Sequence, residues 1–147
     1  MMSAGETDGM EETLTIIKPD AVRAGNTGRI IGHLEDAGFE VQAMRRMRRS
    51  RAQAEAFYAV HRDRPFYADL VAFMTSGPVV AIALARENAV AHLRDTMGAT
   101  DSTQAAEGTI RNLYGTNIQN NAIHGSDSPE NAGLERAFFF AACDLVD

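Results

Sequence analysis

The residue of this sequence with the clearest chemical potential is His124. It lies in the segment NNAIHGSDSPENAGLE, residues 120–135, between an apolar dipeptide and a turn rich in Gly, Ser and Asp. A neutral imidazole is a competent nucleophile near neutral pH when a partner fixes its tautomer. Ser126 and Glu135 are candidate partners, because a helix that starts at Ser128 could bring Glu135 back towards the ring. Composition alone leaves a structural role for His124 open.

Three cations stand at or near the ends of predicted elements. Lys18 closes the first strand, Arg94 lies in a helix, and Arg111 lies in the long loop that follows, with Thr100 and Asn121 as polar neighbours. Singly, each cation would be read as a surface residue. Together they could form a cradle for a polyphosphate, which works by positioning and charge neutralisation. The sequence contains no G-x-x-x-x-G-K-[ST] motif, so such a site would not use the backbone amides of a P-loop.

The elements that must position these residues alternate between strands and helices. Strands are predicted at 13–17, where Pro19 stops the run, at 39–48, at 79–85 and, as a short segment, at 122–124. In the second strand, Phe39, Val41 and Ala43 alternate with polar neighbours. Helices are predicted at 26–38, 50–61, 64–77, 87–98 and from 128 onwards, with Ser50 and Ser128 as N-caps and Gly38 and Gly98 at C-termini.

This order of elements indicates an α/β (α+β) fold. It predicts the ferredoxin-like, split-βαβ arrangement, with a four-stranded, mostly antiparallel sheet covered by helices. Residues 99–120 lack clear periodicity, and a loop of that length inside a small domain is usually functional or disordered.

The bulk properties narrow the class of protein. The 147 residues suit a single domain, which we expect at 13–147 after a flexible acidic tail at 1–12. The N-terminal segment lacks the basic start and apolar stretch of a signal peptide, and the one cysteine, Cys143, cannot form an intrachain disulfide. We therefore expect a cytoplasmic protein that has no contact with membranes. The net charge of -6 argues against a nucleic-acid binder, and the basic run Arg45–Arg51 is expected to be a solvated strand end.

Several segments together resemble the nucleoside diphosphate kinase family. The segments TLTIIKPDAV, FYAVHRDRPFY, LVAFMTSGPVV, MGATD, GTIR and NAIHGSDSPE match that family in order and spacing, over about residues 13–140. The pattern N-x-x-H-G-S-D-S is highly specific. The resemblance implies a ferredoxin-like core and reversible, Mg²⁺-dependent ping-pong transfer of the γ-phosphate between nucleotides, through a phosphohistidine. It also implies a homo-oligomer built from dimers, a hexamer first and a tetramer second.

The resemblance also assigns roles to residues of this sequence. It makes His124 the nucleophile, phosphorylated at the pros nitrogen, with Ser126 and Glu135 orienting the ring and Tyr58 beside it. Lys18 and Asn121 would contact the sugar and the terminal phosphate, Phe66 would stack on the base, and His61 could line the phosphate site. The α- and β-phosphates would be held by Arg94, Thr100 and Arg111. Magnesium would be held through the nucleotide phosphates, with no protein side chain as ligand.

Other functions remain as alternatives, and the long loop departs from the family pattern. One alternative is a ferredoxin-like nucleic-acid-binding or partner-binding module without catalysis, and another is a protein-histidine phosphotransfer module. In the loop, Ser102 and Glu107 stand where the family has prolines, and Leu113 stands where it has an acidic residue. We expect these changes to affect the conformation and assembly of the loop, so that the higher oligomer is weaker than is typical.

Overall fold

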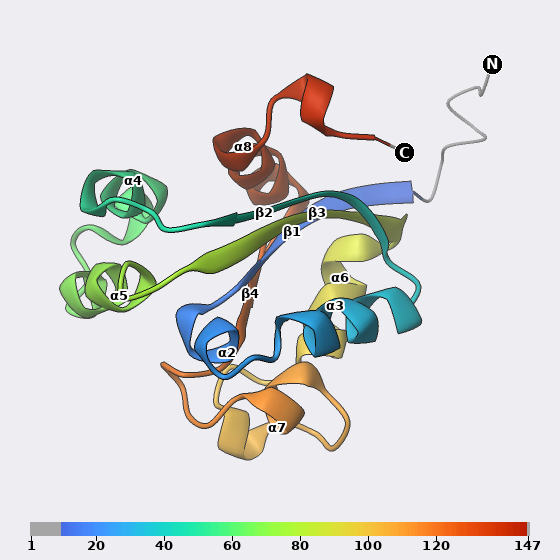
Figure 1. Ribbon diagram of the computed structural model, residues 1–147, viewed down its shortest axis with the longest axis horizontal. Helices are drawn as coiled ribbons and strands as arrows, with labels where there is room; N and C mark the ends of the chain where they lie inside the picture. The colour runs from blue at the N-terminus through green and yellow to red at the C-terminus, as the bar shows by residue number, and fades with distance from the viewer. Residues whose placement is uncertain (1–9, 147) are drawn as a thin grey trace.

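The computed structural model describes residues 10–146, and its centre is one four-stranded sheet (Figure 1). The strands are β1 Met10–Ile17, β2 Glu40–Met47, β3 Val79–Glu87 and β4 Ile123–Gly125, in the order β2-β3-β1-β4. All neighbouring strands pair antiparallel. The order places β1 and β3 at the centre, as in a split βαβ arrangement. The predicted fold class is therefore confirmed.

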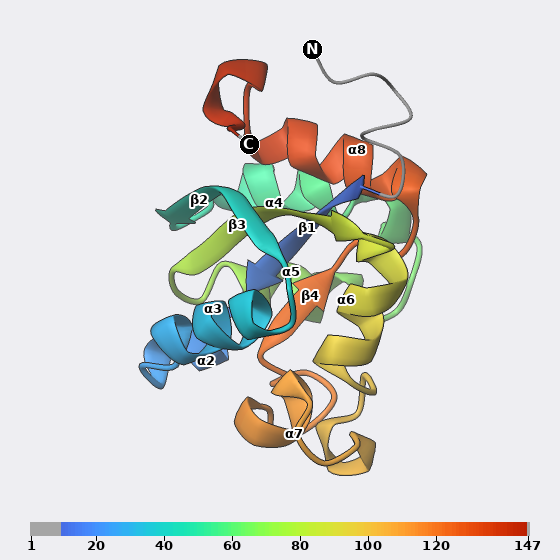
Figure 2. The same cartoon turned by 90° about the vertical axis from the view of Figure 1, so that its right-hand side faces the viewer.

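Helices cover both faces of the sheet, as Figures 1 and 2 show. One face carries α3 (Thr27–Asp36) and α6 (Ala89–Met97), and the other carries α4 (Arg51–Phe57), α5 (Tyr67–Met74) and α8 (Pro129–Phe139). The central strand β3 is buried on both faces, which explains its nearly continuous apolar sequence. No helix in residues 10–146 is long and apolar enough to cross a membrane.

Two packed cores hold these layers together. On the first face Ile82 and Leu84 of β3 pack with Leu34 of α3 and Leu93 of α6. On the second face the alternate residues of β3 include the small side chains of Ala81 and Ala83, which pack with residues of α4, α5 and α8. Because side chains of a strand alternate between faces, the short apolar run fills both cores at once.

The predicted helix caps form as expected. The Ser50 hydroxyl accepts a hydrogen bond from Gln53 N at 3.1 Å, and the Gln53 side chain accepts one from Ser50 N, which completes a capping box at α4. Ser128 accepts from Asn131 N at 3.1 Å, and Pro129 occupies the first turn of α8. These caps fix where α4 and α8 begin, and α8 carries Glu135.

Several boundaries predicted from the sequence are wrong. The first strand begins at Met10, three residues before the predicted start, so residues 10–12 belong to the sheet and not to a tail; residues 1–9 lie outside the described part of the chain. Pro19 does not only stop the strand, because it opens the short helix α2 (Pro19–Arg23). The region 99–120 is not structureless: it holds the 3-10 turn η2 (Ser102–Gln104) and the helix α7 (Ile110–Tyr114). Both elements are too short to show a period.

The basic run and the strand before it also differ from the prediction. The strict alternation in β2 is broken by an irregularity between Val41 and Ala43, and Gln42 between them is buried. Arg45 and Arg48 are exposed, as a solvated strand end requires, but Arg49 is only 3% exposed. The remaining 3-10 turns are η1 (Ala59–His61) and η3 (Ala142–Asp144).

Candidate active site

The backbone around His124 is held rigidly at the edge of the sheet. His124 pairs with Ile16 of β1, and its carbonyl accepts a hydrogen bond from the Thr15 hydroxyl at 2.6 Å. Just before β4 the chain forms a γ-turn, in which Ile123 N donates to Asn121 O at 2.9 Å across Ala122. Ala122 has a φ of 75°, a left-handed value that is strained for a residue with a side chain. Such strain persists only where the surrounding structure fixes it.

Gly125 lets the helix α6 approach β4 directly after His124. A Cβ atom at this position would lie 2.8 Å from side-chain atoms of both Leu93 and Met97, which is closer than real Cβ contacts allow. The glycine therefore permits close packing of α6 against the strand that carries His124.

The His124 ring is oriented by two residues from the segment that follows it. Its Nε2 lies 2.9 Å from Glu135 Oε1, and the Ser126 hydroxyl donates to the same oxygen at 2.8 Å. A carboxylate only accepts hydrogen bonds, so Nε2 carries the hydrogen and Nδ1 keeps a free lone pair. The structure thus brings together His124, Ser126 and Glu135, as the sequence indicated.

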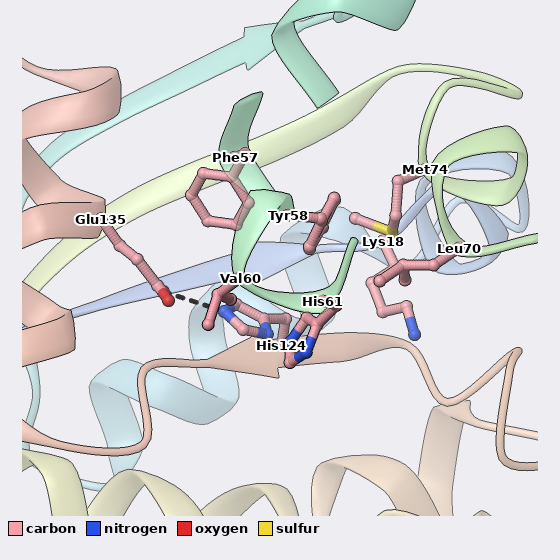
Figure 3. A pocket seen from close by; sticks show the side chains of 9 residues that line it. All are labelled: Lys18, Phe57, Tyr58, Val60, His61, Leu70, Met74, His124 and Glu135. Carbon is pink, nitrogen blue, oxygen red and sulfur yellow. Dashed lines mark hydrogen bonds and ion pairs between the residues drawn. The ribbon is translucent and has the colours of Figure 1, made fainter. Parts of the chain in front are cut away.

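A cavity of about 140 Å³, here called the histidine cavity, opens beside this ring (Figure 3). Figure 3 shows the Glu135 carboxylate reaching the imidazole from one side, while the Lys18 side chain lies on the other. Phe57 meets the imidazole edge-on, with ring centroids 6.1 Å apart. The cavity lining is Lys18, Phe57, Tyr58, Val60, His61, Leu70, Met74, His124 and Glu135. Tyr58 and His61 are therefore placed beside the nucleophile candidate.

Lys18 is buried, and its ammonium is held in place by neighbouring oxygens. Its Nζ donates to Asn121 Oδ1 at 2.7 Å and to Gln119 O at 2.9 Å. Burial lowers the pKa of Lys18 to about 8, and the opposing charge of Asp20 limits the fall. The pKa of Asp20 is raised, mainly by burial, although its carboxylate accepts from Ala122 N at 3.1 Å. A buried lysine of this kind is typical of a functional site.

Arg111 is fixed by the backbone on both sides. Its Nη1 donates to Gly98 O at 3.0 Å, and its Nη2 donates to Ile123 O at 2.7 Å. Burial lowers the pKa of Arg111 to about 10. The helix α7 that carries it is capped by Thr109, whose hydroxyl accepts from Asn112 N. The segment predicted as an irregular loop is thus an ordered support for one cation.

Two further cavities extend this region: the first shares Lys18, Leu70 and His124 with the histidine cavity, and the second shares Thr100, Arg111, Gly125 and Asp127 with the first. The wide cavity, about 620 Å³, is lined by Lys18, Phe66, Asp69, Leu70, Phe73, Thr100, Arg111, Ile118, Gln119, Asn121, Ile123, His124, Gly125 and Asp127. The arginine cavity, about 390 Å³, is lined by Arg94, Met97, Gly98, Ala99, Thr100, Arg111, Gly125, Ser126 and Asp127. Every site residue predicted from the sequence lines one of the three cavities. Long-range contacts therefore gather residues from 18 to 135 into one concave region.

Asn121 and Thr100 link the two ends of this region. The Asn121 side-chain amide donates to Thr100 O at 3.0 Å, while its oxygen accepts from Lys18. Arg94 and the Thr100 side chain are exposed and face solvent at the rim. We call Lys18, Arg94, Thr100, Arg111 and Asn121 the cation cradle.

Two exposed apolar side chains line the wide cavity, and the sequence predicted one of them. Phe66 is 49% exposed at the start of α5, so it is not the core aromatic that its neighbours Leu70 and Phe73 could suggest. Ile118 is 61% exposed and lines the same cavity. The sequence reading missed Ile118, although an isolated apolar residue in the polar stretch around it was an available signal.

Two polar residues of the site were also not predicted from the sequence. Asp127 lies inside the histidine motif and lines both the wide and the arginine cavities, but no role was assigned to it. Gln119 contributes only its carbonyl, which no side-chain pattern can reveal. Within residues 10–146, no group of three or more His, Cys, Asp or Glu side chains is arranged to hold a metal ion.

Comparison with known proteins identifies relatives over nearly the whole chain. A sequence model of the family described as "Nucleoside diphosphate kinase" matches residues 11–145. The nucleoside diphosphate kinases of Persephonella marina and Wolinella succinogenes are 49% and 57% identical to the chain. These matches cover 94% and 92% of the chain, and each covers 99% of the relative.

Solved structures agree with this result. The nucleoside diphosphate kinase of Aquifex aeolicus superimposes with a TM-score of 0.92 at 44% identity, over 93% of this chain and 99% of that one. A halophilic nucleoside diphosphate kinase from Halobacterium salinarum, solved in complex with CDP, gives a TM-score of 0.88 at 42% identity, over 93% and 91%. The sequence and fold matches favour the enzyme over a binding module without catalysis. The chain belongs to the nucleoside diphosphate kinase family and is a phosphotransferase of that kind.

Proposed function

We propose that His124 Nδ1 carries the phosphoryl group between a nucleoside triphosphate and a nucleoside diphosphate. The observation that carries the proposal is the hydrogen bond of Nε2 to Glu135, which leaves Nδ1 as the nucleophilic nitrogen. Ser126 donates to the same carboxylate and so holds it against the ring. The two residues act by fixing the tautomer and the direction of the lone pair.

The reaction then proceeds in two reversible halves. The Nδ1 lone pair forms a bond to the γ-phosphorus, and the bond between that phosphorus and the β,γ-bridging oxygen breaks. The nucleoside diphosphate leaves, and a second one attacks the phosphohistidine with its terminal oxygen. A phosphoramidate has a high transfer potential, so the same site runs in both directions with ping-pong kinetics.

The cation cradle would position the phosphates and neutralise their charge. Lys18 and Asn121 line the wide cavity together with His124 and are hydrogen-bonded to each other, and they are assigned to the terminal phosphate and the sugar. Arg94, Thr100 and Arg111 are assigned to the α- and β-phosphates. Because Lys18 and Arg111 are already held by backbone carbonyls, they would meet the nucleotide with little reorganisation. His61 lines the histidine cavity and is assigned a minor phosphate contact, and Tyr58 a contact with the transferred group.

The base would lie between Phe66 and Ile118. Both side chains are exposed, apolar and on the lining of the wide cavity. Stacking on an aromatic face tolerates any base, because each base offers a π-face. The relative from Halobacterium salinarum was solved with CDP, which supports nucleotides as ligands of this chain as well.

Magnesium is the metal that we assign to the reaction. Asp127 and Thr100 line the same cavities as Arg111, so the region offers oxygen donors that suit a hard cation. Magnesium would be held chiefly through phosphate oxygens, with Asp127 near its water ligands. When bound, it neutralises charge on the β- and γ-phosphates.

We also propose a homo-oligomer built from dimers, most readily a hexamer, working in the cytoplasm. The outer edge of β2 has no partner strand within residues 10–146, and Met44 on this strand is 53% exposed. The exposed free thiol of Cys143 suits a reducing compartment. Sedimentation over a dilution series tests the assembly, and a monomer at every concentration would contradict it.

The phosphohistidine is tested by labelling with γ-labelled ATP. The wild-type protein should acquire an acid-labile label that is lost when GDP is added, and His124→Ala should acquire none. His33→Ala is the matched control, since this histidine lies on α3 and outside the three cavities. Unfolding curves of all three proteins show whether the fold is intact. Labelling that persists in a folded His124→Ala variant would refute the assignment.

A further inference from the structure

Arg49 is a buried cation without a counter-ion. It is 3% exposed and forms no ion pair with a carboxylate in the described part of the chain. Its guanidinium carbon lies 5.1 Å from the ring centre of Phe57, 5.3 Å from that of Tyr58 and 5.6 Å from that of Phe139. Of its nitrogens, Nη2 donates to the Tyr58 hydroxyl at 3.2 Å, while Nε and Nη1 are buried without a hydrogen-bond partner.

This arrangement is a poor solution for packing alone. Burying a charge and two unsatisfied donors is costly, and the aromatic faces offset only part of that cost. An apolar side chain of similar length, such as methionine, would fill the space between the rings without the penalty. Positions that break such rules are expected at functional sites. The charge of Arg49 therefore calls for a role beyond packing.

Two of the rings around Arg49 also line the histidine cavity. Phe57 contacts the His124 imidazole edge-on, and Tyr58 faces the cavity together with Lys18 and His124, as Figure 3 shows. Arg49 itself lies behind these rings and is not part of the cavity lining. Its influence on the reaction must therefore pass through its neighbours.

The hydrogen bond between Arg49 and Tyr58 has a fixed direction. A guanidinium can only donate, whereas a phenol hydroxyl both accepts and donates one hydrogen. Among residues 10–146, Arg49 is the hydrogen-bond partner of this hydroxyl. With a lone pair occupied by the guanidinium, the O–H bond must point away from Arg49. Burial raises the pKa of Tyr58, which keeps the hydroxyl protonated and able to donate.

We infer that Arg49 is a positioning residue for the phosphoryl transfer. By donating to the Tyr58 hydroxyl, it turns the O–H hydrogen towards the phosphoryl group on His124, so that Tyr58 donates to a phosphate oxygen as the group is transferred. The inference rests on the proposed phosphohistidine at His124. It assigns a function to the residue of the basic run that is buried while its neighbours are exposed.

A double-mutant cycle tests this inference. The four proteins are the wild type, Arg49→Met, Tyr58→Phe and the double variant, and Arg49→Lys is added to retain a cation that can donate. The rate constant of phosphoenzyme formation from ATP is measured by rapid mixing, and the unfolding midpoint is measured in parallel. Arg49→Leu, which also has no donor, replaces Arg49→Met in the cycle if the methionine variant does not fold.

The expected pattern separates positioning from packing. Arg49→Met should slow phosphorylation by about 3- to 10-fold, which is the change in rate expected when one hydrogen bond is lost in the transition state. It should not lower the unfolding midpoint. In the Tyr58→Phe background the same change should cause no further slowing, and Arg49→Lys should recover part of the wild-type rate. Equal slowing in both backgrounds, or no slowing in the single variant, would overturn the inference. Absence of phosphoenzyme in the wild type would instead reject the proposed function.

Discussion

Raising the pH above 8 should remove the charge of Lys18 before that of the other cations in the cradle. Burial lowers the pKa of this lysine to about 8, whereas its ordinary value is 10.5. The lysine is charged below its pKa and neutral above it, so its phosphate-binding form is lost as the pH rises. Above pH 8 the charged fraction in the free protein falls about tenfold for each pH unit. Over the same range Tyr58 stays protonated, because burial raises its pKa above 10.0.

The size of the effect follows from these values. The ratio kcat/KM reports groups of the free enzyme, so it should fall with an apparent pKa of about 8. The fall should level off about 10- to 150-fold below the neutral value, which corresponds to about 1.5–3 kcal/mol for one charge-assisted hydrogen bond. A second decrease should be centred near pH 10, where about half of Arg111 has lost its proton. A bound phosphate raises the pKa of Lys18, so kcat should stay level to higher pH than kcat/KM.

The assay is phosphoenzyme formation at limiting ATP and excess magnesium, from pH 7 to pH 10. Lys18→Ala is the matched control: it should start at the lower plateau and show no decrease centred at pH 8. A wild-type ratio kcat/KM that stays flat to pH 10 would refute the reasoning. The same decrease in Lys18→Ala would show that another group titrates.

Three further predictions concern the supports of the site and the base. Ser128→Ala should lower the unfolding free energy by about 1 kcal/mol through loss of the α8 cap, and it should also slow phosphorylation because α8 carries Glu135. Ser50→Ala, at the cap of α4, should lower stability similarly and leave Glu135 in place; equal kinetic effects of the two variants would argue against the role of α8. Ala122→Gly should raise the unfolding free energy in urea by up to about 1 kcal/mol, since glycine adopts the left-handed backbone without strain, and a clear loss of stability would show that the strain is absent. The acceptors ADP, GDP, CDP and UDP should differ in kcat/KM by less than about a thousandfold, and a larger preference would reveal a contact that reads the edge of the base.

The parts of the molecule that the sequence predicted well are those with a strong local signal. The strand 79–85 is continuous and apolar, and the caps at Ser50 and Ser128 are fixed by side-chain chemistry. The pairing of His124 with Glu135 followed from the cap, because about 1.7 turns of helix separate Glu135 from Pro129.

The features that escaped prediction depend on contacts between distant segments. The burial of Arg49 is set by Phe57 and Phe139, which lie on different helices, and nothing in the basic run distinguishes this arginine from its neighbours. The helix α7 has only five residues, too few for an apolar period, and its Ile110 is buried by tertiary packing. Ile118 lies in a turn, so its role depends on the residues that it faces across the wide cavity and no local sequence pattern reveals it.

The shared carboxylate oxygen of Glu135 has a consequence for the protons of the reaction. Transfer of a phosphoryl group to Nδ1 leaves Nε2–H in place, so the ring becomes positively charged and Glu135 is already its counter-ion. The Ser126 hydroxyl donates to the same oxygen and so holds the carboxylate against the ring. Neither half of the reaction then has to release a proton to water or take one up. The His124 ring should accordingly add no pH dependence to the equilibrium between the free and phosphorylated protein, and any dependence near pH 8 should come from Lys18.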